Sequence, residues 1–241
     1  MIVNIPHSSL HIPAAHTRNM TLSPQELAEE LLFSTDIDTD ELIEAAPGIV
    51  LQIAAVSRLV CDTERFADDS KEAMAALGRG VVYLKTAKGK TLRNFDADEQ
   101  KEIIAHYYLP YHTALTQKVS HELAERDKAL IIDLHSFHPE NTHSPDAAGK
   151  VQLCIGTDPY HTPKDLLLTV QGYLGAAGYE TTVNFPFSGA LVPLAFYQRD
   201  SRVSSIMLEL NRSIYLQNSN QKEQMKGVLQ GLTLKLQKMG W

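Results

Sequence analysis

The sequence predicts an α/β fold in which a mixed, mainly parallel sheet has helices on both faces. Short apolar runs typical of buried strands alternate along the chain with longer segments of helical periodicity. A chain of 241 residues, of which 44% are hydrophobic, can bury one substantial core. The sequence has no internal repeat, low-complexity tract or dividing linker, so we expect a single domain over residues 1–241.

The N-terminal part of the chain carries clear local signals for strand and helix. Residues 2–5 form a short apolar run that predicts the first strand. A helix is expected to begin after Ser23, because Pro24 suits the first helical position and Glu26 can complete a capping box with the serine. The next expected elements are a short helix near Thr39 and strands at 49–56, 59–61 and 81–84.

The longest helix is expected over residues 96–126. Apolar residues recur there at spacings of three and four, which places them on one face of a helix; they are Ile104, Tyr107, Tyr111, Leu115, Val119 and Leu123. Pro110 predicts a kink, because proline lacks the backbone N–H that a helix interior needs. The remaining expected elements are strands at 129–134, 151–155, 180–184 and 204–210 and helices at 163–177 and 220–238.

Composition and charge argue against several classes of partner. The formal net charge of −7 is opposite to that of a nucleic-acid binder, which needs a cationic face. No apolar run is long enough to span a bilayer, and residues 1–6 resemble a first strand rather than a signal peptide. Cys61 and Cys154 lie in apolar runs, as buried thiols of a reducing compartment do. We therefore expect a soluble cytoplasmic protein that binds neither nucleic acid nor membrane.

Polar side chains stand at the ends of four predicted strands. The segments are His7-Ser8-Ser9, Ser57-Arg58 with Asp62-Thr63-Glu64-Arg65, Asp133-Leu134-His135-Ser136 and Glu209-Leu210-Asn211-Arg212. Such groups are costly to bury unless they are paired or bound to a metal. Open α/β sheets bind their ligands at the carboxyl ends of the strands, so we expect a site at one edge of the sheet.

Two histidines and a carboxylate, with a fourth position open to water, are the ligand set of a hydrolytic zinc site. His7 and His135 fit this set; a further carboxylate would serve as general base, and arginines would bind an anionic substrate. Taken alone, His135 also fits a core histidine bonded to a neighbouring carboxylate. The alternative for all of these residues is a set of unrelated ion pairs. Their recurrence at several strand ends supports a metal site as much as this alternative, so both stay open at this point.

A series of short motifs extends this pattern over residues 2–212. The motifs are Pro6-His7-Ser8, Thr35-Asp36, Ser57-Arg58 with Asp62 and Arg65, Tyr111-His112, Asp133-Leu134-His135-Ser136, Asn184-Phe185-Pro186-Phe187-Ser188-Gly189 and Glu209-Leu210-Asn211. In this order they resemble the N-formylglutamate amidohydrolase family. The resemblance implies a three-layer α/β/α sandwich like that of zinc carboxypeptidases. It also implies metal-dependent hydrolysis of an N-acyl amide on an acidic amino acid.

The resemblance assigns the metal ligands. It implies that His7, Asp36 and His135 bind Zn²⁺, although the same ligands also suit other divalent first-row metals. Asp38 and Asp40 lie close enough in sequence to replace Asp36 as the carboxylate ligand. Acidic residues before a helix also fit a simpler role, because they interact favourably with the positive end of its dipole.

The resemblance also assigns the catalytic groups. Glu209 would act as general base and then protonate the leaving amine, or else serve as a buried partner for Arg58 or Arg212. His112 would donate a hydrogen bond to the developing oxyanion, or else be a helix-surface or core histidine. Asp133 would hold the imidazole of His135 in one tautomer or cap the strand end.

The remaining matched residues are expected to contact the substrate. Arg58, Arg65 and Arg212 would bind its carboxylates, although an arginine more commonly forms a surface ion pair. The other expected contacts are Ser136, Asn184, Ser188 and Gly189.

The chain departs from the family pattern at two places near the expected substrate site. Glu64 stands where relatives carry asparagine, and Ala190 follows Gly189 where relatives carry a second glycine. The resemblance implies N-formyl-L-glutamate as the leading candidate substrate, but a carboxylate at position 64 would weaken the binding of a dianion. The alternatives are a deacylase or carboxypeptidase acting on another N-acyl amino acid or small peptide, and a metal-binding or ligand-binding homologue without catalysis.

Overall fold

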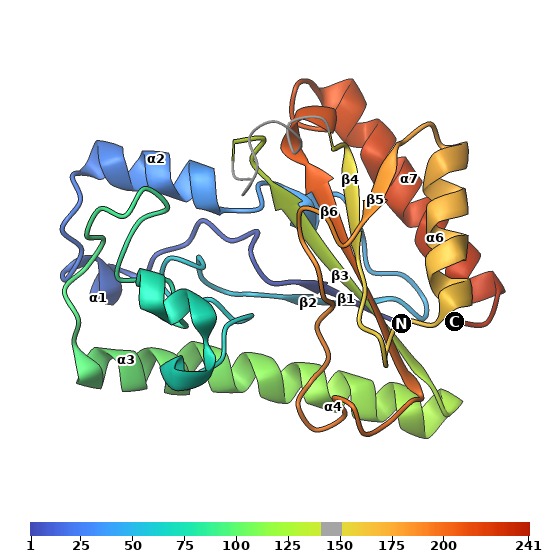
Figure 1. Cartoon of the computed structure of the whole chain (residues 1–241), viewed down its shortest axis with the longest axis horizontal. Coiled ribbons are helices and arrows are strands. Elements are labelled where there is room, and N and C mark those ends of the chain that lie inside the picture. Colours follow the sequence, from blue (N-terminus) through green and yellow to red (C-terminus); the bar gives the residue numbers. More distant parts are fainter. Residues whose placement is uncertain (141–150) are drawn as a thin grey trace. The chain divides into compact units, whose positions relative to one another are not determined.

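The computed structural model describes residues 1–140 and 151–241 (Figure 1). They form two compact units, and both are discontinuous in sequence because the chain passes back and forth between them. Unit 1 comprises Met1–Ile5, Asp38–Gln52 and Leu115–Trp241, and unit 2 comprises Pro6–Ile37 and Ile53–Ala114. The single domain expected over residues 1–241 stays a prediction.

Unit 1 is built around a mixed sheet, which confirms the predicted α/β class. In the described part of the chain the strand order is β2-β1-β3-β6-β4-β5. The strands are β1 (Ile2–Ile5), β2 (Val50–Ile53), β3 (Ala129–Phe137), β4 (Leu153–Gly156), β5 (Thr181–Val183) and β6 (Val203–Asn211). β3 pairs in parallel with β1 and β6, and β4 pairs in parallel with β5. Only the β4–β6 pairing is antiparallel among those described.

The two faces of the central strand β3 have different partners. Leu130, Ile132 and Leu134 belong to the apolar core formed with helices α6 (Lys164–Ala176) and α7 (Ser219–Lys238), which lie side by side in Figure 1. Ala129 and Ile131 point to the opposite face and pack in a second core with Leu115 and Val119 of helix α4 (Leu109–Arg126). Because side chains alternate along a strand, this second face continues into polar positions 133 and 135.

Unit 2 consists of short helices joined by long turns. Its helical elements are α1 (Ala14–Thr17), α2 (Pro24–Ser34), η2 (Asp69–Lys71), η3 (Ala73–Leu77), α3 (Ala97–Ile103) and η4 (Ile104–Tyr108). The capping box predicted for α2 is confirmed: the backbone N–H of Glu26 donates to Ser23 Oγ, and that of Ser23 donates to Glu26 Oε2. One core of this unit joins Leu59, Tyr83 and Leu92 to Leu27 and Leu31.

The strands predicted at 59–61 and 81–84 are wrong. Both segments are buried in unit 2, but their backbone hydrogen bonds close local turns; Val60 N–H donates to Ser57 O, and Leu84 N–H donates to Gly78 O. A short apolar run signals burial, and burial alone does not distinguish a strand from a packed turn. β3, by contrast, extends to Phe137, so His135 and Ser136 lie within the strand and not after it.

The long helix predicted over 96–126 is present as three consecutive segments. Asp96 caps its start, with its side chain accepting from the N–H groups of Asp98 and Glu99. The π-helical segment η4 then separates α3 from α4, directly before Pro110. Since proline cannot donate to the helical ladder, the irregularity that Pro110 predicts takes the form of this widened turn. Across residues 1–140 and 151–241, no helix combines the length and apolar character required to cross a bilayer.

Candidate metal and substrate site

Four polar side chains lie on one face of the sheet in unit 1, towards the carboxyl ends of β1, β3 and β6. They are Asn4, Asp133, His135 and Glu209, which we call the strand cluster, and all of them are buried. Strand register brings them together: Asn4 is paired with Asp133, and His135 is paired with Glu209. Register neighbours in a parallel pair point to the same face, so the sheet itself holds the imidazole beside the carboxylate.

Asp133 connects three partners within the strand cluster and its surroundings. Its Oδ1 accepts a hydrogen bond from Asn4 Nδ2 at 2.8 Å and lies 3.2 Å from His135 Nε2. Its Oδ2 accepts from the backbone N–H of Leu191 at 3.2 Å. A carboxylate at Nε2 favours the tautomer that carries hydrogen on that nitrogen, which is the orienting role expected for Asp133.

Ser136 and Arg212 meet at the carboxyl ends of β3 and β6. Arg212 opens the short helix η5 (Arg212–Ile214) directly after β6, and its Nε donates to Ser136 Oγ at 3.3 Å. Both side chains are buried. The structure therefore brings together two of the residues expected to contact substrate.

In unit 2, His7 lies between two carboxylates. Its Nδ1 is 3.7 Å from Asp36 Oδ2, and its Nε2 is 2.9 Å from Asp62 Oδ1. Two ligands of a tetrahedral zinc ion, each at about 2.0–2.1 Å, lie roughly 3.3 Å apart, so His7 Nδ1 and Asp36 Oδ2 are spaced to bind one cation. The N–H of Asp36 also donates to His7 O at 2.9 Å, which ties the two backbones together.

The other two carboxylates considered for the metal have different surroundings. Asp38 Oδ2 accepts a hydrogen bond from Lys222 Nζ at 2.6 Å, and Asp40 is exposed. Asp36 follows the last turn of α2 directly, and only 2% of its surface is accessible. Of the three, Asp36 is the one with the burial and the imidazole partner of a metal ligand.

Asp62 is the centre of the charged network of unit 2. We call this network, made of His7, Asp36, Arg58, Asp62 and Tyr83, the Asp62 cluster. Arg58 donates to Asp62 Oδ2 from Nε at 3.2 Å and from Nη2 at 2.7 Å, and the Tyr83 hydroxyl donates to the same oxygen at 2.6 Å. Asp62 is fully buried, so these contacts replace its hydration.

The pKa values in the Asp62 cluster follow from this arrangement. Burial disfavours the charged form of Asp62, yet the charges of Arg58, His7 and Arg65 hold its pKa well below the usual range. Burial and the charge of Arg58 act against protonation of His7, but the adjacent Asp62 and Asp36 carboxylates raise its pKa overall. The Asp62 cluster therefore favours the charged forms of Asp62 and His7, although both side chains are buried.

The arginines expected to bind substrate are used differently. Besides its two bonds to Asp62, Arg58 has Nη1 3.9 Å from Asp36 Oδ1, so it neutralises the buried carboxylates. Arg65 approaches Asp62 less closely, with Nε 3.6 Å from Oδ2, and its side chain is more exposed. Glu64 contributes its backbone N–H to Asp62 Oδ1 at 3.1 Å.

His112 supports the turn that follows Asp62. Its Nε2 lies 2.8 Å from the carbonyl oxygen of Thr63; since a carbonyl only accepts, Nε2 carries the hydrogen. Burial lowers the pKa of this imidazole, which favours the neutral ring, and the ring packs against Tyr108 with centroids 4.2 Å apart. The hydrogen bond from His112 to Thr63 O therefore holds in place the turn that follows Asp62.

The 184–189 segment, predicted to contact substrate, lies in unit 1. Asn184 holds the end of β4 in place: its Oδ1 accepts from Thr157 N–H at 2.9 Å, and its Nδ2 donates to Thr157 Oγ1 at 2.8 Å. Ser188 is exposed, and Gly189 has a positive φ of 95° that favours glycine. A Cβ at Gly156 would lie 2.2 Å from Gly189 O, so the two segments approach closely only because position 156 has no side chain.

Sequence reasoning missed three residues of these clusters. Asp62 was part of a recognised motif but had no assigned role, Asn4 lies within a strand, and Tyr83 lies within an apolar run. The signal for Tyr83 was available in principle, because a buried tyrosine needs a partner for its hydroxyl.

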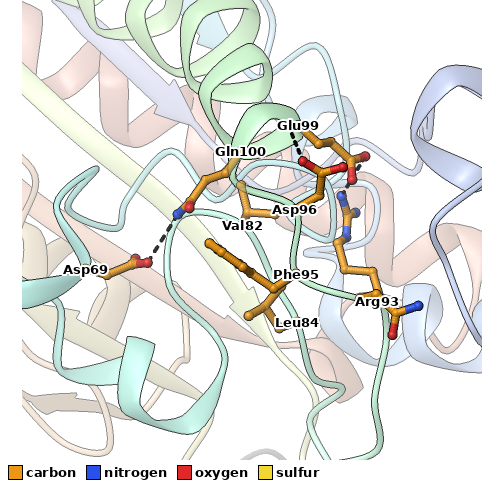
Figure 2. Close-up of a pocket in the computed structure, with 9 residues that line it drawn as sticks. Asp69, Val82, Leu84, Arg93, Phe95, Asp96, Glu99 and Gln100 are labelled. Carbon is orange, nitrogen blue, oxygen red and sulfur yellow. Dashed lines mark hydrogen bonds and ion pairs between the residues drawn. The ribbon is translucent and has the colours of Figure 1, made fainter.

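A cavity of unit 2 lies apart from these contacts. Figure 2 shows its lining, in which Arg93 faces Glu99 and Gln100 reaches Asp69. The cavity measures about 20 Å³, which is room for a single water molecule, and neither cluster contributes to its lining.

Comparison with known proteins identifies the family. The crystal structure of N-formylglutamate amidohydrolase from Ralstonia eutropha JMP134 is similar with a TM-score of 0.85 at 22% identity, covering 99% of this chain and 92% of that chain. A gene product of Agrobacterium tumefaciens is similar with a TM-score of 0.73 at 17% identity, covering 100% of this chain and 91% of that chain. These likenesses support the fold, and no curated protein matches the sequence. Residues 1–216 match the family described as N-formylglutamate amidohydrolase, and the chain belongs to that family.

Proposed function

We propose that the protein is a zinc-dependent amidohydrolase that converts N-formyl-L-glutamate and water to formate and L-glutamate. Family membership supports an amidohydrolase. The observation that carries the metal is the pairing of His7 Nδ1 with Asp36 Oδ2 at 3.7 Å, backed by Asp62 on the other ring nitrogen. A buried imidazole held between two carboxylates is the environment of a metal ligand with its orienting partner.

We propose that His7, Asp36 and His135 bind the same zinc ion. Chain connectivity supports this, because β1 leads through Pro6 directly to His7, and Asn4 of β1 is in register with Asp133 of β3. His7 therefore follows directly, along the chain, a strand that pairs with the strand carrying His135. In this proposal Asp62 orients His7 and Asp133 orients His135, each through the Nε2 atom that it contacts.

The chemistry divides between the metal and the residues of the chain. When bound, zinc lowers the pKa of a water molecule and polarises the amide carbonyl. Glu209 accepts a proton from the attacking water and donates it to the leaving nitrogen as the C–N bond breaks. Its place beside His135 in the strand register supports this role. We retain His112 as the proposed hydrogen-bond donor to the oxyanion, which requires its Nε2–H to turn from Thr63 O or its Nδ1 to be protonated.

The substrate contacts are also part of the proposal. Arg58, Arg65 and Arg212 form the cationic side of the site, and Ser136, Asn184, Ser188 and Gly189 complete it. Arg65 is better placed than Arg58 to bind a substrate carboxylate, because Arg58 already makes two hydrogen bonds to Asp62. A three-layer, carboxypeptidase-like architecture would present these residues at the sheet edge.

A second candidate function is the hydrolysis of a different N-acyl amino acid. The observation that favours it is Glu64, which lies between Arg58 and Arg65 in the sequence and donates its backbone N–H to Asp62 Oδ1. A negative side chain there would disfavour a dianionic substrate by electrostatic repulsion. A panel of N-formyl and N-acetyl derivatives of glutamate, glutamine and alanine separates the two candidates.

The test is release of formate by purified, zinc-loaded protein, compared with a Glu209→Gln variant. We expect the variant to lose about 100-fold or more in kcat, because general acid–base catalysis contributes about that much. Glu223→Gln is the matched control, since Glu223 is exposed on α7, and it should retain wild-type activity. Equal rates for wild type and Glu209→Gln would contradict the proposal, as would full activity after the metal is removed by a chelator.

A further inference from the structure

Unit 2 contains a third arginine beside the Asp62 cluster, in addition to Arg58 and Arg65. Arg79 lies over the ring of Tyr83, with its Cζ 4.9 Å from the ring centroid. Arg58 approaches the same ring at 5.9 Å. No motif of the sequence drew attention to Arg79, because it lies between two glycines in a turn of unit 2.

The backbone holds Arg79 in this position. Arg79 and Tyr83 face each other across an isolated antiparallel bridge, and Gly78 O accepts hydrogen bonds from the N–H groups of Leu84 and Lys85. The Tyr83 hydroxyl is in turn bonded to Asp62. Because its planar group rests on an aromatic face that is itself anchored, Arg79 loses little freedom when it binds a ligand.

Arg79 also differs from the other two arginines in its charge partners. Arg58 is paired with Asp62, and Arg65 has Asp62 at 3.6 Å. Arg79 forms no ion pair with any residue of the described segments, and its buried Nε has no hydrogen-bond partner there. A guanidinium that is partly buried without a carboxylate can bind an incoming anion without breaking an existing contact.

Both positive and negative groups surround Arg79 and Tyr83. Burial and the charge of Asp62 raise the pKa of Tyr83, whereas the charges of Arg58, Arg79 and Arg65 lower it, so three cations oppose the one carboxylate to which its hydroxyl donates. Two further carboxylates lie in this part of unit 2. Glu72 accepts from the N–H groups of Phe66 and Met74, and its charge acts on Arg65. Asp69 Oδ1 would lie 2.5 Å from a Cβ at Gly80, the residue that follows Arg79.

We propose that Arg79, together with Arg65, binds the side-chain carboxylate of an acidic acyl amino acid and thereby selects dicarboxylate substrates. This inference rests on the proposed amidohydrolase function, because it assigns specificity within that site. Arg79 acts only in substrate binding, so its removal should raise KM more than it lowers kcat.

The experiment compares Arg79→Gln with wild type on two substrates of nearly the same shape. N-formyl-L-glutamate carries a side-chain carboxylate, and N-formyl-L-glutamine carries a neutral amide in its place. We expect the ratio of their kcat/KM values to fall by about 10- to 100-fold, the range for a charge-assisted hydrogen bond. Arg79→Lys should recover part of the ratio, because it keeps the charge without the planar fork. Arg18→Gln, an exposed arginine of unit 2, is the matched control.

Two outcomes overturn the inference. An unchanged ratio would show that Arg79 does not read the side-chain carboxylate, and an equal loss on both substrates would indicate a general structural role. A binding measurement separates the inference from the proposed function. If wild type hydrolyses neither substrate, the function fails, and calorimetry with glutarate and butyrate then tests the site alone. Weaker glutarate binding in Arg79→Gln, with butyrate unaffected, would support the carboxylate site, and equal glutarate affinity would refute it.

Discussion

The strand cluster of unit 1 and the Asp62 cluster of unit 2 hold similar residues by different means. In the strand cluster, neighbouring strands set the positions, and Asp133 accepts hydrogen bonds from the neutral groups of Asn4 and Leu191, with His135 Nε2 3.2 Å from its Oδ1. In the Asp62 cluster, turns carry the side chains, and Asp62 is balanced by the full charge of Arg58.

This difference determines how strongly the loss of a carboxylate destabilises each cluster. A carboxylate among neutral donors can be replaced by an amide at the loss of part of its hydrogen bonding. A carboxylate that neutralises a buried cation cannot be replaced in this way, because its removal leaves the cation buried without a counter-charge. We therefore expect the Asp62 cluster to be the more sensitive of the two to loss of a single charge.

The largest expected effect is that of Asp62→Asn. The substitution removes the main counter-charge of Arg58 and leaves it only the more distant Asp36 carboxylate. We expect a loss of about 3–5 kcal/mol in the free energy of unfolding. Denaturant unfolding at neutral pH measures it. Asp68→Asn is the matched control, because Asp68 is an exposed carboxylate of the same unit, and it should change stability by less than about 0.5 kcal/mol.

Acid pH sharpens this prediction. Since the folded state lowers the pKa of Asp62, its stabilising contribution is fully present above the unfolded value of about 3.9 and is lost as the pH falls further. The difference between wild type and Asp62→Asn should therefore narrow between pH 5 and pH 2. A difference that stays constant over this range would contradict the role assigned to the Asp62 charge.

A smaller effect is expected for Asp133→Asn. The amide keeps one acceptor oxygen, so one of the two donors, Asn4 or the Leu191 N–H, loses its partner. We expect a loss of about 1–3 kcal/mol in the free energy of unfolding, below that of Asp62→Asn. If Asp133→Asn is the more damaging substitution under the same conditions, the comparison between the clusters is wrong.

The last prediction tests packing beside the strand cluster without changing any charge, and its expected effect is of the same size as that of Asp133→Asn. A Cβ at Gly156 would meet Gly189 O at 2.2 Å and Met207 Cε at 2.4 Å, so Gly156→Ala should destabilise by about 1–3 kcal/mol. Gly172→Ala is the matched control, because nothing lies within 4 Å of its Cβ position in α6, and it should stabilise by about 0.5–1 kcal/mol. Thermal unfolding of both variants measures the contrast, and equal shifts would refute the close approach at Gly156.

Local signals explain the parts of the fold that the sequence predicted well. The start of α2 follows from Ser23, Pro24 and Glu26, and the core face of α4 follows from the spacing of Leu115 and Val119. β3 was found because its apolar residues are consecutive. These features depend on residues within a few positions of one another, so the sequence contains them completely.

The candidate site was predictable in its residue types but not in its pairings. His7, Asp36, Asp133 and Glu209 could be named because polar groups interrupt apolar runs or match a family motif. The short apolar runs at 59–61 and 81–84 were predicted to be strands, although both are buried turns. Apolar composition indicates burial, whereas the backbone partner of a buried segment depends on residues elsewhere in the chain.

By itself, the sequence determined the α/β class, the helix caps and apolar faces, and the family to which the chain belongs. Only the tertiary structure decided that Arg58 neutralises Asp62, that Tyr83 anchors the same carboxylate, and that Arg79 rests on the Tyr83 ring. The physical reason is the distance along the sequence over which each interaction acts. Helical periodicity and capping act over a few residues, but a buried charge takes its partner from whichever turn packs against it.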